Sequence, residues 1–258
     1  MENNFYNIFD SHAHYDDKWF DEDREVLLSS MQENGVYGIV NNSVDLKTAK
    51  VCIDFCEKYD FMYGAVGYHP ENLENMPSDY LDKLAELLQH KKIVAVGETG
   101  LDYHWDILKD LQNRVFEEQL KLSLDLKMPI IVHDREAHGD TLDYLRKYKP
   151  KALVHCFSGS VEMMREVMRY GSYISLGGVV TFKNARHSVE VAKEVPIDRL
   201  LLETDCPYMS PVPFRGKRCD STMIKYTAVK IAEIRNIGVQ ELLNITAENA
   251  KRFYGIDD

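Results

Sequence analysis

Ile93-Val-Ala-Val-Gly-Glu98 is a short apolar run that ends in a carboxylate. This form is typical of a buried parallel strand with a functional group at its carboxyl end. Four further segments have the same form and end in histidine or aspartate: Phe9-Asp-Ser-His-Ala-His14, Ile130-Ile-Val-His133, Ala152-Leu-Val-His155 and Leu200-Leu-Leu-Glu-Thr-Asp205. Because all five supply metal-binding side chains, they predict one metal centre assembled from distant parts of the chain.

Apolar runs of this kind recur along the whole chain, with helical patterns between them. Strands are expected near residues 7–11, 38–42, 62–66, 93–97, 129–133, 152–155, 173–176 and 200–203. Helices are expected at 22–34, 79–90, 108–127, 161–170, 221–236 and 239–253. Eight strands that alternate with helices predict an α/β fold, a single (β/α)8 TIM barrel with a helical C-terminal tail.

The alternative fold is a doubly wound open sheet, which binds its ligand at one switch point between strands. Such a sheet has difficulty in bringing the ends of the first, fourth, fifth, sixth and eighth strands together, whereas a closed barrel does so naturally. The length of 258 residues suits one large domain, and no stretch rich in Pro, Gly or Ser divides it. Residues 1–258 are therefore predicted to form a single domain.

The candidate ligands are too numerous for one tetrahedral ion. His12 and His14 are separated by one residue, so both imidazoles face the same side of a strand, although such a pair alone is equally compatible with two surface histidines. The carboxylate of Glu98 has two oxygens and can bridge two cations. The expected division is a first ion bound by His12, His14, Glu98 and Asp205, and a second bound by Glu98, His133 and His155.

Two such ions stabilise the attacking and leaving oxygens of a displacement and activate water at neutral pH. Glu98 and Asp205 are the predicted catalytic residues, since Asp205 can also accept a proton from the activated water. Imidazole and carboxylate ligands without thiolate suit Mg, Mn, Zn, Co or Fe, and the sequence does not choose among them.

Composition narrows the class of protein. A net charge of −11 argues against non-specific binding of polyanions over the whole surface, but it leaves room for a local basic site. The five scattered cysteines do not form the dense pattern of a disulfide framework. With no signal-peptide pattern in Met1-Glu-Asn-Asn-Phe-Tyr-Asn7 and no apolar run of 18 residues, the chain is expected to be cytoplasmic, with no membrane contact and no obligatory protein partner.

Seven motifs occur in order along nearly the whole chain: Asp10-Ser-His-Ala-His14, Gly67-Tyr-His-Pro70, Gly97-Glu-Thr-Gly-Leu-Asp102, His133-Asp-Arg135, His155-Cys-Phe-Ser-Gly159, Leu202-Glu-Thr-Asp-Cys-Pro207 and Arg215-Gly-Lys-Arg218. Together they resemble the TatD-like metal-dependent deoxyribonucleases, a branch of the amidohydrolase-type barrels. The resemblance implies a TIM-type barrel, divalent metals, and hydrolysis of phosphodiester bonds in DNA, often from the 3′ end. It also implies that the six candidate ligands bind the metals.

The chain departs from the family pattern at one place. Cys219-Asp220-Ser221 follows Arg215-Gly-Lys-Arg218, where the family usually has Asn-Glu-Pro. No ligand is lost, but the departure bears on the geometry of this loop and on substrate preference.

Residues 207–219 contain three basic residues and no acidic one, and they follow Asp205 closely. Arginine forks match phosphate oxygens and lysine adds a point charge, so the predicted substrate-binding residues are Arg135, Arg215, Lys217, Arg218 and His69. Tyr208 and Phe214 are candidates for stacking a base. The alternative for the segment is a solvated loop with two packing aromatics.

Three functions are open on these residues. The leading prediction is a two-metal 3′–5′ exodeoxyribonuclease that acts on single-stranded DNA ends. The second is a two-metal amide or ester hydrolase, such as a deacylase or cyclic amidase; Glu98 would take the place of the carboxylated lysine that some relatives use. The third is a metal-dependent scaffold protein. A scaffold would not need six metal ligands at the accessible end of a barrel.

Overall fold

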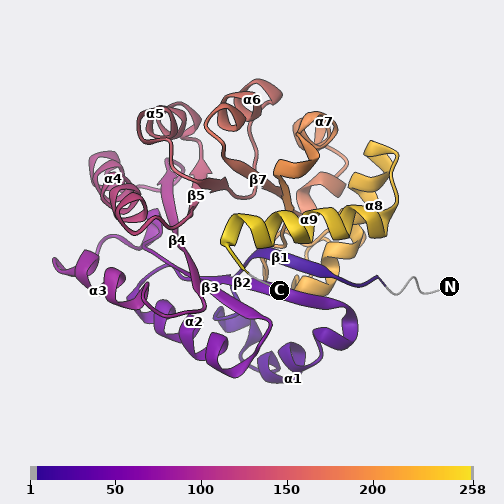
Figure 1. Cartoon of the computed structure of the whole chain (residues 1–258), viewed down its shortest axis with the longest axis horizontal. Helices are drawn as coiled ribbons and strands as arrows, with labels where there is room; N and C mark the ends of the chain where they lie inside the picture. Colours follow the sequence, from indigo (N-terminus) through magenta and orange to yellow (C-terminus); the bar gives the residue numbers. More distant parts are fainter. Residues whose placement is uncertain (1–4, 257–258) are drawn as a thin grey trace.

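Eight parallel strands form one sheet in the computed structural model, which describes residues 5–256 (Figure 1). The strands are β1 Ile8–Ala13, β2 Val36–Asn42, β3 Met62–Val66, β4 Ile93–Asp102, β5 Ile130–Arg135, β6 Ala152–Val154, β7 Tyr173–Leu176 and β8 Leu200–Leu202. They pair in sequence order, each with the next. The predicted domain includes residues 1–4 and 257–258, which lie outside this description.

The first and last strands meet and close the sheet into a barrel. A parallel bridge joins Ala13 to Cys206, just beyond β8. The amide of His14 donates to the Cys206 carbonyl at 2.8 Å, and the amide of Asp205 donates to the His12 carbonyl at 3.0 Å. The (β/α)8 prediction is thus confirmed, and the closure places the ligand segments of β1 and β8 side by side.

Helices surround the barrel (Figure 1). They are α1 Arg24–Ser29, α2 Leu46–Lys58, α3 Tyr80–Leu87, α4 Lys109–Leu126, α5 His138–Tyr148, α6 Val161–Arg169, α7 Arg186–Glu194, α8 Ile224–Arg235 and α9 Val239–Tyr254. Among the described residues, none of these helices combines the length and apolar character needed to cross a membrane.

The barrel interior is filled by one apolar side chain from each strand, packed against the last helix. These side chains are Phe9, Val40, Ala65, Ala95, Ile131, Leu153, Tyr173 and Leu201. Phe253 and Tyr254 of α9 join the same cluster, and the Tyr254 hydroxyl donates to the Ser11 carbonyl at 2.7 Å. The predicted C-terminal helical tail is therefore part of the core, and it leaves the carboxyl ends of the strands for the functional site.

Two local features differ from the prediction. The helix expected at 22–34 is split into α1 and a 3₁₀ turn at Gln32–Asn34, and at the break the Ser30 hydroxyl donates to the Leu27 carbonyl at 2.8 Å. Helices α2, α5 and α7 have no counterpart among the predicted ranges; α5 and α7 are short and polar on average, so few apolar residues mark them.

Candidate metal centre

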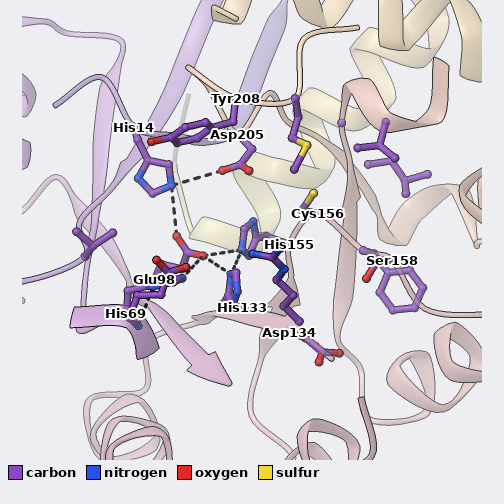
Figure 2. Close-up of a pocket in the computed structure, with 18 of the residues that line it drawn as sticks. His14, His69, Glu98, His133, Asp134, His155, Cys156, Ser158, Asp205 and Tyr208 are labelled. Carbon is purple, nitrogen blue, oxygen red and sulfur yellow. Dashed lines mark hydrogen bonds and ion pairs between the residues drawn. The ribbon is translucent and has the colours of Figure 1, made fainter. Parts of the chain in front are cut away.

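The six predicted ligands converge at the carboxyl ends of the strands. His12 lies in β1 and His14 follows it, Glu98 lies in β4 and His133 lies in β5. His155 directly follows β6, and Asp205 is the third residue after β8. In Figure 2 the side chains of His14, Glu98, His133, His155 and Asp205 point toward one another across the pocket. Distant segments of the chain therefore form one cluster, as predicted from the polar residues at the ends of the apolar runs.

The first half of the cluster gathers around one oxygen of Glu98. Its Oε2 lies 3.2 Å from His12 Nε2 and 3.3 Å from His14 Nε2. Asp205 Oδ1 lies 3.7 Å from His12 Nε2 and 3.5 Å from His14 Nε2, and the two imidazole nitrogens are 3.0 Å apart. Four potential ligand atoms thus face one small volume.

The second half gathers around the other oxygen of the same carboxylate. Glu98 Oε1 lies 2.8 Å from His133 Nδ1 and 2.7 Å from His155 Nε2. The two nitrogens are 3.3 Å apart. Glu98 therefore stands between two groups of ligands and presents one oxygen to each.

Neighbouring hydrogen bonds direct the lone pairs of two histidines into the cluster. Nδ1 of His14 lies 3.0 Å from the Asn42 carbonyl, and Nε2 of His133 lies 2.9 Å from Asp102 Oδ2. A carbonyl or carboxylate oxygen accepts a proton from the nitrogen that faces it, so the opposite nitrogen of each neutral ring carries the lone pair. Those opposite nitrogens are the ones that face Glu98.

This donor set fits two divalent ions. Ligands about 2.1 Å from a tetrahedral ion are about 3.4 Å apart, and the ligand atoms of both groups are separated by 2.7–3.7 Å. Two imidazole nitrogens that face each other at 3.0 Å, as those of His12 and His14 do, need a proton or a cation between them.

The electrostatics of the cluster favour positive charge. Burial would raise the pKa of Glu98, but His155, His69 and His12 hold it well below its ordinary value. Burial would lower the pKa of His133, but hydrogen bonds to Asp102 and Glu98 raise it to about 10. Carboxylates that hold a proton on an imidazole so firmly are equally suited to hold a cation beside it.

Three buried carboxylates that are not among the predicted site residues support the cluster. Asp10 accepts hydrogen bonds from Thr204 Oγ1 at 2.6 Å and from Ser221 Oγ at 2.7 Å. Asp102 orients His133, as described above. Glu203 Oε1 accepts a hydrogen bond from the Cys156 amide at 2.6 Å, and its Oε2 lies 3.9 Å from His155 Nδ1. The available signal was an acidic residue within an apolar strand, which needs a partner when buried.

A glycine permits the close approach of β4 and β5 beside Glu98. Gly100 has φ +147°, a conformation that other residues rarely adopt. A Cβ atom at this position would lie 2.0 Å from the His133 carbonyl oxygen. The glycine therefore sets the distance at which His133 faces Glu98.

His69, predicted to contact substrate, lies next to the second group of ligands. Its Nδ1 accepts a hydrogen bond from the Glu71 amide at 3.2 Å, so the neutral ring carries its proton on Nε2. This Nε2 lies 3.4 Å from Glu98 Oε1. In this tautomer His69 is a hydrogen-bond donor at the edge of the cluster.

A cavity of about 680 Å³ opens over the cluster. Its wall includes Arg135, whose side chain is 46% exposed and whose Nη1 lies 4.0 Å from Asp102 Oδ2. Tyr208 also lines it, with its hydroxyl donating to Asp17 at 2.8 Å. The structure thus brings Arg135 and His69 to the cavity above the candidate metal positions.

The basic residues after β8 lie elsewhere. Within the described residues, the lining of the cavity includes Tyr208 and Met209 but none of the three predicted cations of this segment. Arg218 binds both oxygens of Asp23 at 2.7 and 2.6 Å and donates to the Trp19 carbonyl. Arg215 stacks 4.1 Å from the Phe182 ring centre, and Lys217 lies 5.8 Å from that of Phe214. Arg218 thus ties two loops together, and substrate contact by these three stays a prediction.

The segment that departs from the family pattern, Cys219-Asp220-Ser221, contacts the buried carboxylate of Asp10. Asp220 caps the 3₁₀ turn Ser221–Met223 through the Thr222 amide at 2.9 Å. The Ser221 hydroxyl lies 2.7 Å from Asp10 Oδ2 and 2.7 Å from the Tyr15 hydroxyl. Ser221 therefore fixes the side chain of Asp10, which lies two residues before His12 in β1.

The model of the TatD related DNase family matches residues 9–255 of the chain. The chain belongs to the TatD family. It is 43% identical to the uncharacterized metal-dependent hydrolase YabD of Bacillus subtilis, over 97% of this chain and 100% of the relative. It is 35% identical to the uncharacterized metal-dependent hydrolase YcfH of Escherichia coli, over 97% of this chain and 96% of the relative.

Solved structures agree with this assignment. The TatD homolog YJJV from Escherichia coli K12 superimposes with a TM-score of 0.92 at 28% identity, covering 97% of this chain and 99% of that one. A TatD family hydrolase from Entamoeba histolytica gives a TM-score of 0.84 at 25% identity, covering 97% and 99%. The predicted membership of the TatD family is confirmed, and the protein is a metal-dependent hydrolase of that family.

Proposed function

We propose that this TatD-family protein hydrolyses phosphodiester bonds of DNA and removes nucleotides from single-stranded 3′ ends. The observation that carries the proposal is the position of Glu98, which offers one oxygen to each of two ligand groups beneath an open cavity. Two-metal centres of this arrangement serve in-line displacement at phosphorus. The family name of the matching model points to the same substrate class.

His12, His14, Glu98 and Asp205 would hold one ion, and Glu98, His133 and His155 the other. Mg, Mn and Zn all accept these ligands. When bound, such ions polarise a phosphoryl oxygen and lower the pKa of water.

The side chains of the protein supply the remaining steps. Asp205, whose Oδ1 lies beside His12 and His14 in the first group, is placed to accept a proton from the attacking water. Arg135 offers a planar fork of donors to the phosphate oxygens at the cavity wall. His69 carries a proton on Nε2 and can donate to an oxygen that becomes more negative during the reaction.

A labelled oligonucleotide tests this function. The wild-type protein with Mg²⁺ or Mn²⁺ is expected to release mononucleotides from a single strand labelled at its 3′ end, before any label at the 5′ end is freed. Glu98→Gln and Asp205→Asn should lose at least about 100-fold in rate. Asp143→Asn, an exposed carboxylate on α5, serves as the matched control. Full activity in both site variants would remove the centre from the reaction.

An amide or ester hydrolase is the second candidate, and one observation favours it. Four acidic residues outside the ligand set also line the cavity and suit a substrate less anionic than DNA: Asp16, Asp17, Glu71 and Asp134. Turnover of acyl substrates but not of oligonucleotides, with dependence on Glu98, would select this alternative.

A further inference from the structure

We propose that Trp105 and Arg135 form a shelf at the rim of the cavity that binds the nucleotide next to the scissile phosphate. In this arrangement the indole of Trp105 stacks the base and the guanidinium of Arg135 binds the phosphate that follows it. The inference rests on the proposed action on DNA, and it adds a residue that specifies how the strand lies across the site.

The two side chains are neighbours because their strands are paired. Asp102 of β4 is in register with Arg135 of β5, and the Tyr103 amide donates to the Arg135 carbonyl at 2.9 Å. The chain after β4 therefore passes beside Arg135, and the guanidinium carbon lies 6.0 Å from the centre of the Trp105 ring. Both residues line the cavity together with His133.

The shelf is open to solvent. Trp105 is 47% exposed and lines the cavity. An exposed aromatic ring at the edge of a cavity, beside an arginine, is the pairing by which proteins bind single strands: the ring stacks a base and the cation holds the backbone. The shelf thus combines both parts of such a site.

Arg135 links the shelf to the candidate metal centre. Its Nη1 lies 4.0 Å from Asp102 Oδ2, the same oxygen that lies 2.9 Å from His133 Nε2. At this distance most donors of the guanidinium fork stay available to a ligand. A phosphate bound there would lie beside the residue two positions after His133, the histidine that faces Glu98.

The charge around the cavity gives the strand a direction. Asp16 and Asp17 follow β1, which lies across the barrel from β5 because the strands pair in sequence order. These carboxylates disfavour a phosphate backbone on their side. On the shelf side, Asp134 is paired with His138 at 2.8 Å and Glu136 with His104 at 3.1 Å. The strand therefore leaves the site over Trp105, and its terminal nucleotide faces the acidic side.

Fluorescence tests the stacking directly, because the chain has only two tryptophans. In Trp19→Phe, Trp105 is the one remaining tryptophan. Titration with a phosphorothioate-linked thymidine pentamer, which resists hydrolysis, in Mg²⁺ buffer should quench its emission. Arg135→Ala should weaken the binding about 10-fold, and an abasic pentamer with the same backbone should bind without quenching. Equal quenching by the abasic pentamer, or no quenching by either, would overturn the shelf.

Kinetics give an independent readout. Trp105→Ala should raise KM for a single-stranded oligonucleotide about 10-fold with kcat within about twofold, and Trp105→Phe should restore most of the affinity. Tyr37→Ala removes an exposed aromatic at the amino-terminal end of β2 and is the matched control. Cleavage with unchanged KM in Trp105→Ala would refute the shelf and leave the nuclease function standing. Quenching without any cleavage by the wild type would refute the nuclease function instead.

Discussion

Asp102 Oδ2 lies 2.9 Å from His133 Nε2, on the side of the imidazole away from Glu98. The carboxylate accepts the proton of Nε2 and so leaves the lone pair on Nδ1, which lies 2.8 Å from Glu98 Oε1. Asp102 is itself held by a hydrogen bond from the His104 amide at 3.0 Å. One carboxylate thus decides which nitrogen of His133 is available to a metal.

Asp102→Asn should weaken the second metal position. The amide has the same shape, but its NH₂ can donate to His133 Nε2 and move the ring proton to Nδ1, where it faces Glu98. We expect metal affinity to fall 10–100-fold at this position, measured by isothermal titration calorimetry on the metal-free protein. Unchanged affinity would mean that Asp102 does not set the tautomer.

With two ions bound as proposed, Glu98→Gln should reduce their number to at most one. The neutral amide has only one oxygen, so it cannot offer an oxygen to both ligand groups. Elemental analysis after dialysis against Mn²⁺ or Zn²⁺ measures the stoichiometry, and circular dichroism shows whether the barrel remains folded. Two ions retained per chain in this variant would exclude the bridging role.

Gly100→Ala should destabilise the barrel by about 3 kcal/mol, a fall of about 6–12 °C in Tm. The added methyl group would lie 2.0 Å from the His133 carbonyl oxygen, at a φ of +147° that alanine rarely adopts. Gly139→Ala, in helix α5 with no atom within 4 Å of the new methyl, is the matched control and should be neutral or stabilising by up to about 1 kcal/mol. Equal thermal stability of the two variants would contradict the close approach.

Ser221→Ala should lower the free energy of unfolding by about 1–3 kcal/mol. The change removes a buried hydroxyl that lies 2.7 Å from Asp10 and 2.7 Å from the Tyr15 hydroxyl, and it leaves both with one partner fewer. Urea denaturation measures the difference. Ser78→Ala, at an exposed position, should stay within about 0.5 kcal/mol of wild type, and a similar small effect for Ser221→Ala would show that this segment is not an anchor.

Glu117→Gln should make the free energy of unfolding fall less steeply as the pH is lowered from 7 to 2. Hydrogen bonds from Tyr148 and Lys147 lower the pKa of Glu117 to about 2 in the folded protein. A carboxylate with a lowered pKa stabilises the fold above its unfolded pKa of about 4.5 and loses that contribution as pH falls toward 2. Because the side chain is 29% exposed, we expect a loss below about 1 kcal/mol at pH 7. Urea denaturation of both proteins measures this loss. If the wild type and Glu117→Gln differ in free energy of unfolding by the same amount at pH 7 and at pH 2, the linkage is contradicted.

The strands and ligands could be predicted because their signals are local. The ligand segments are short apolar runs that end at a polar side chain, and burial of parallel strands on both faces makes such runs stand out. The same approach missed α2, α5 and α7, of which α5 and α7 are short and polar on average, and it missed the interruption of the helix after Ser29.

The sequence by itself determined the barrel and brought the six candidate ligands to the ends of its strands, since these follow from residue type and periodicity along the chain. Only the tertiary structure decided what supports them: that Asp102 orients His133, that Ser221 holds Asp10, and that Arg218 pairs with Asp23 away from the cavity. The physical reason is that burial and hydrogen bonding between residues up to about 200 positions apart depend on how strands and loops close in space, which leaves no periodic trace in the chain.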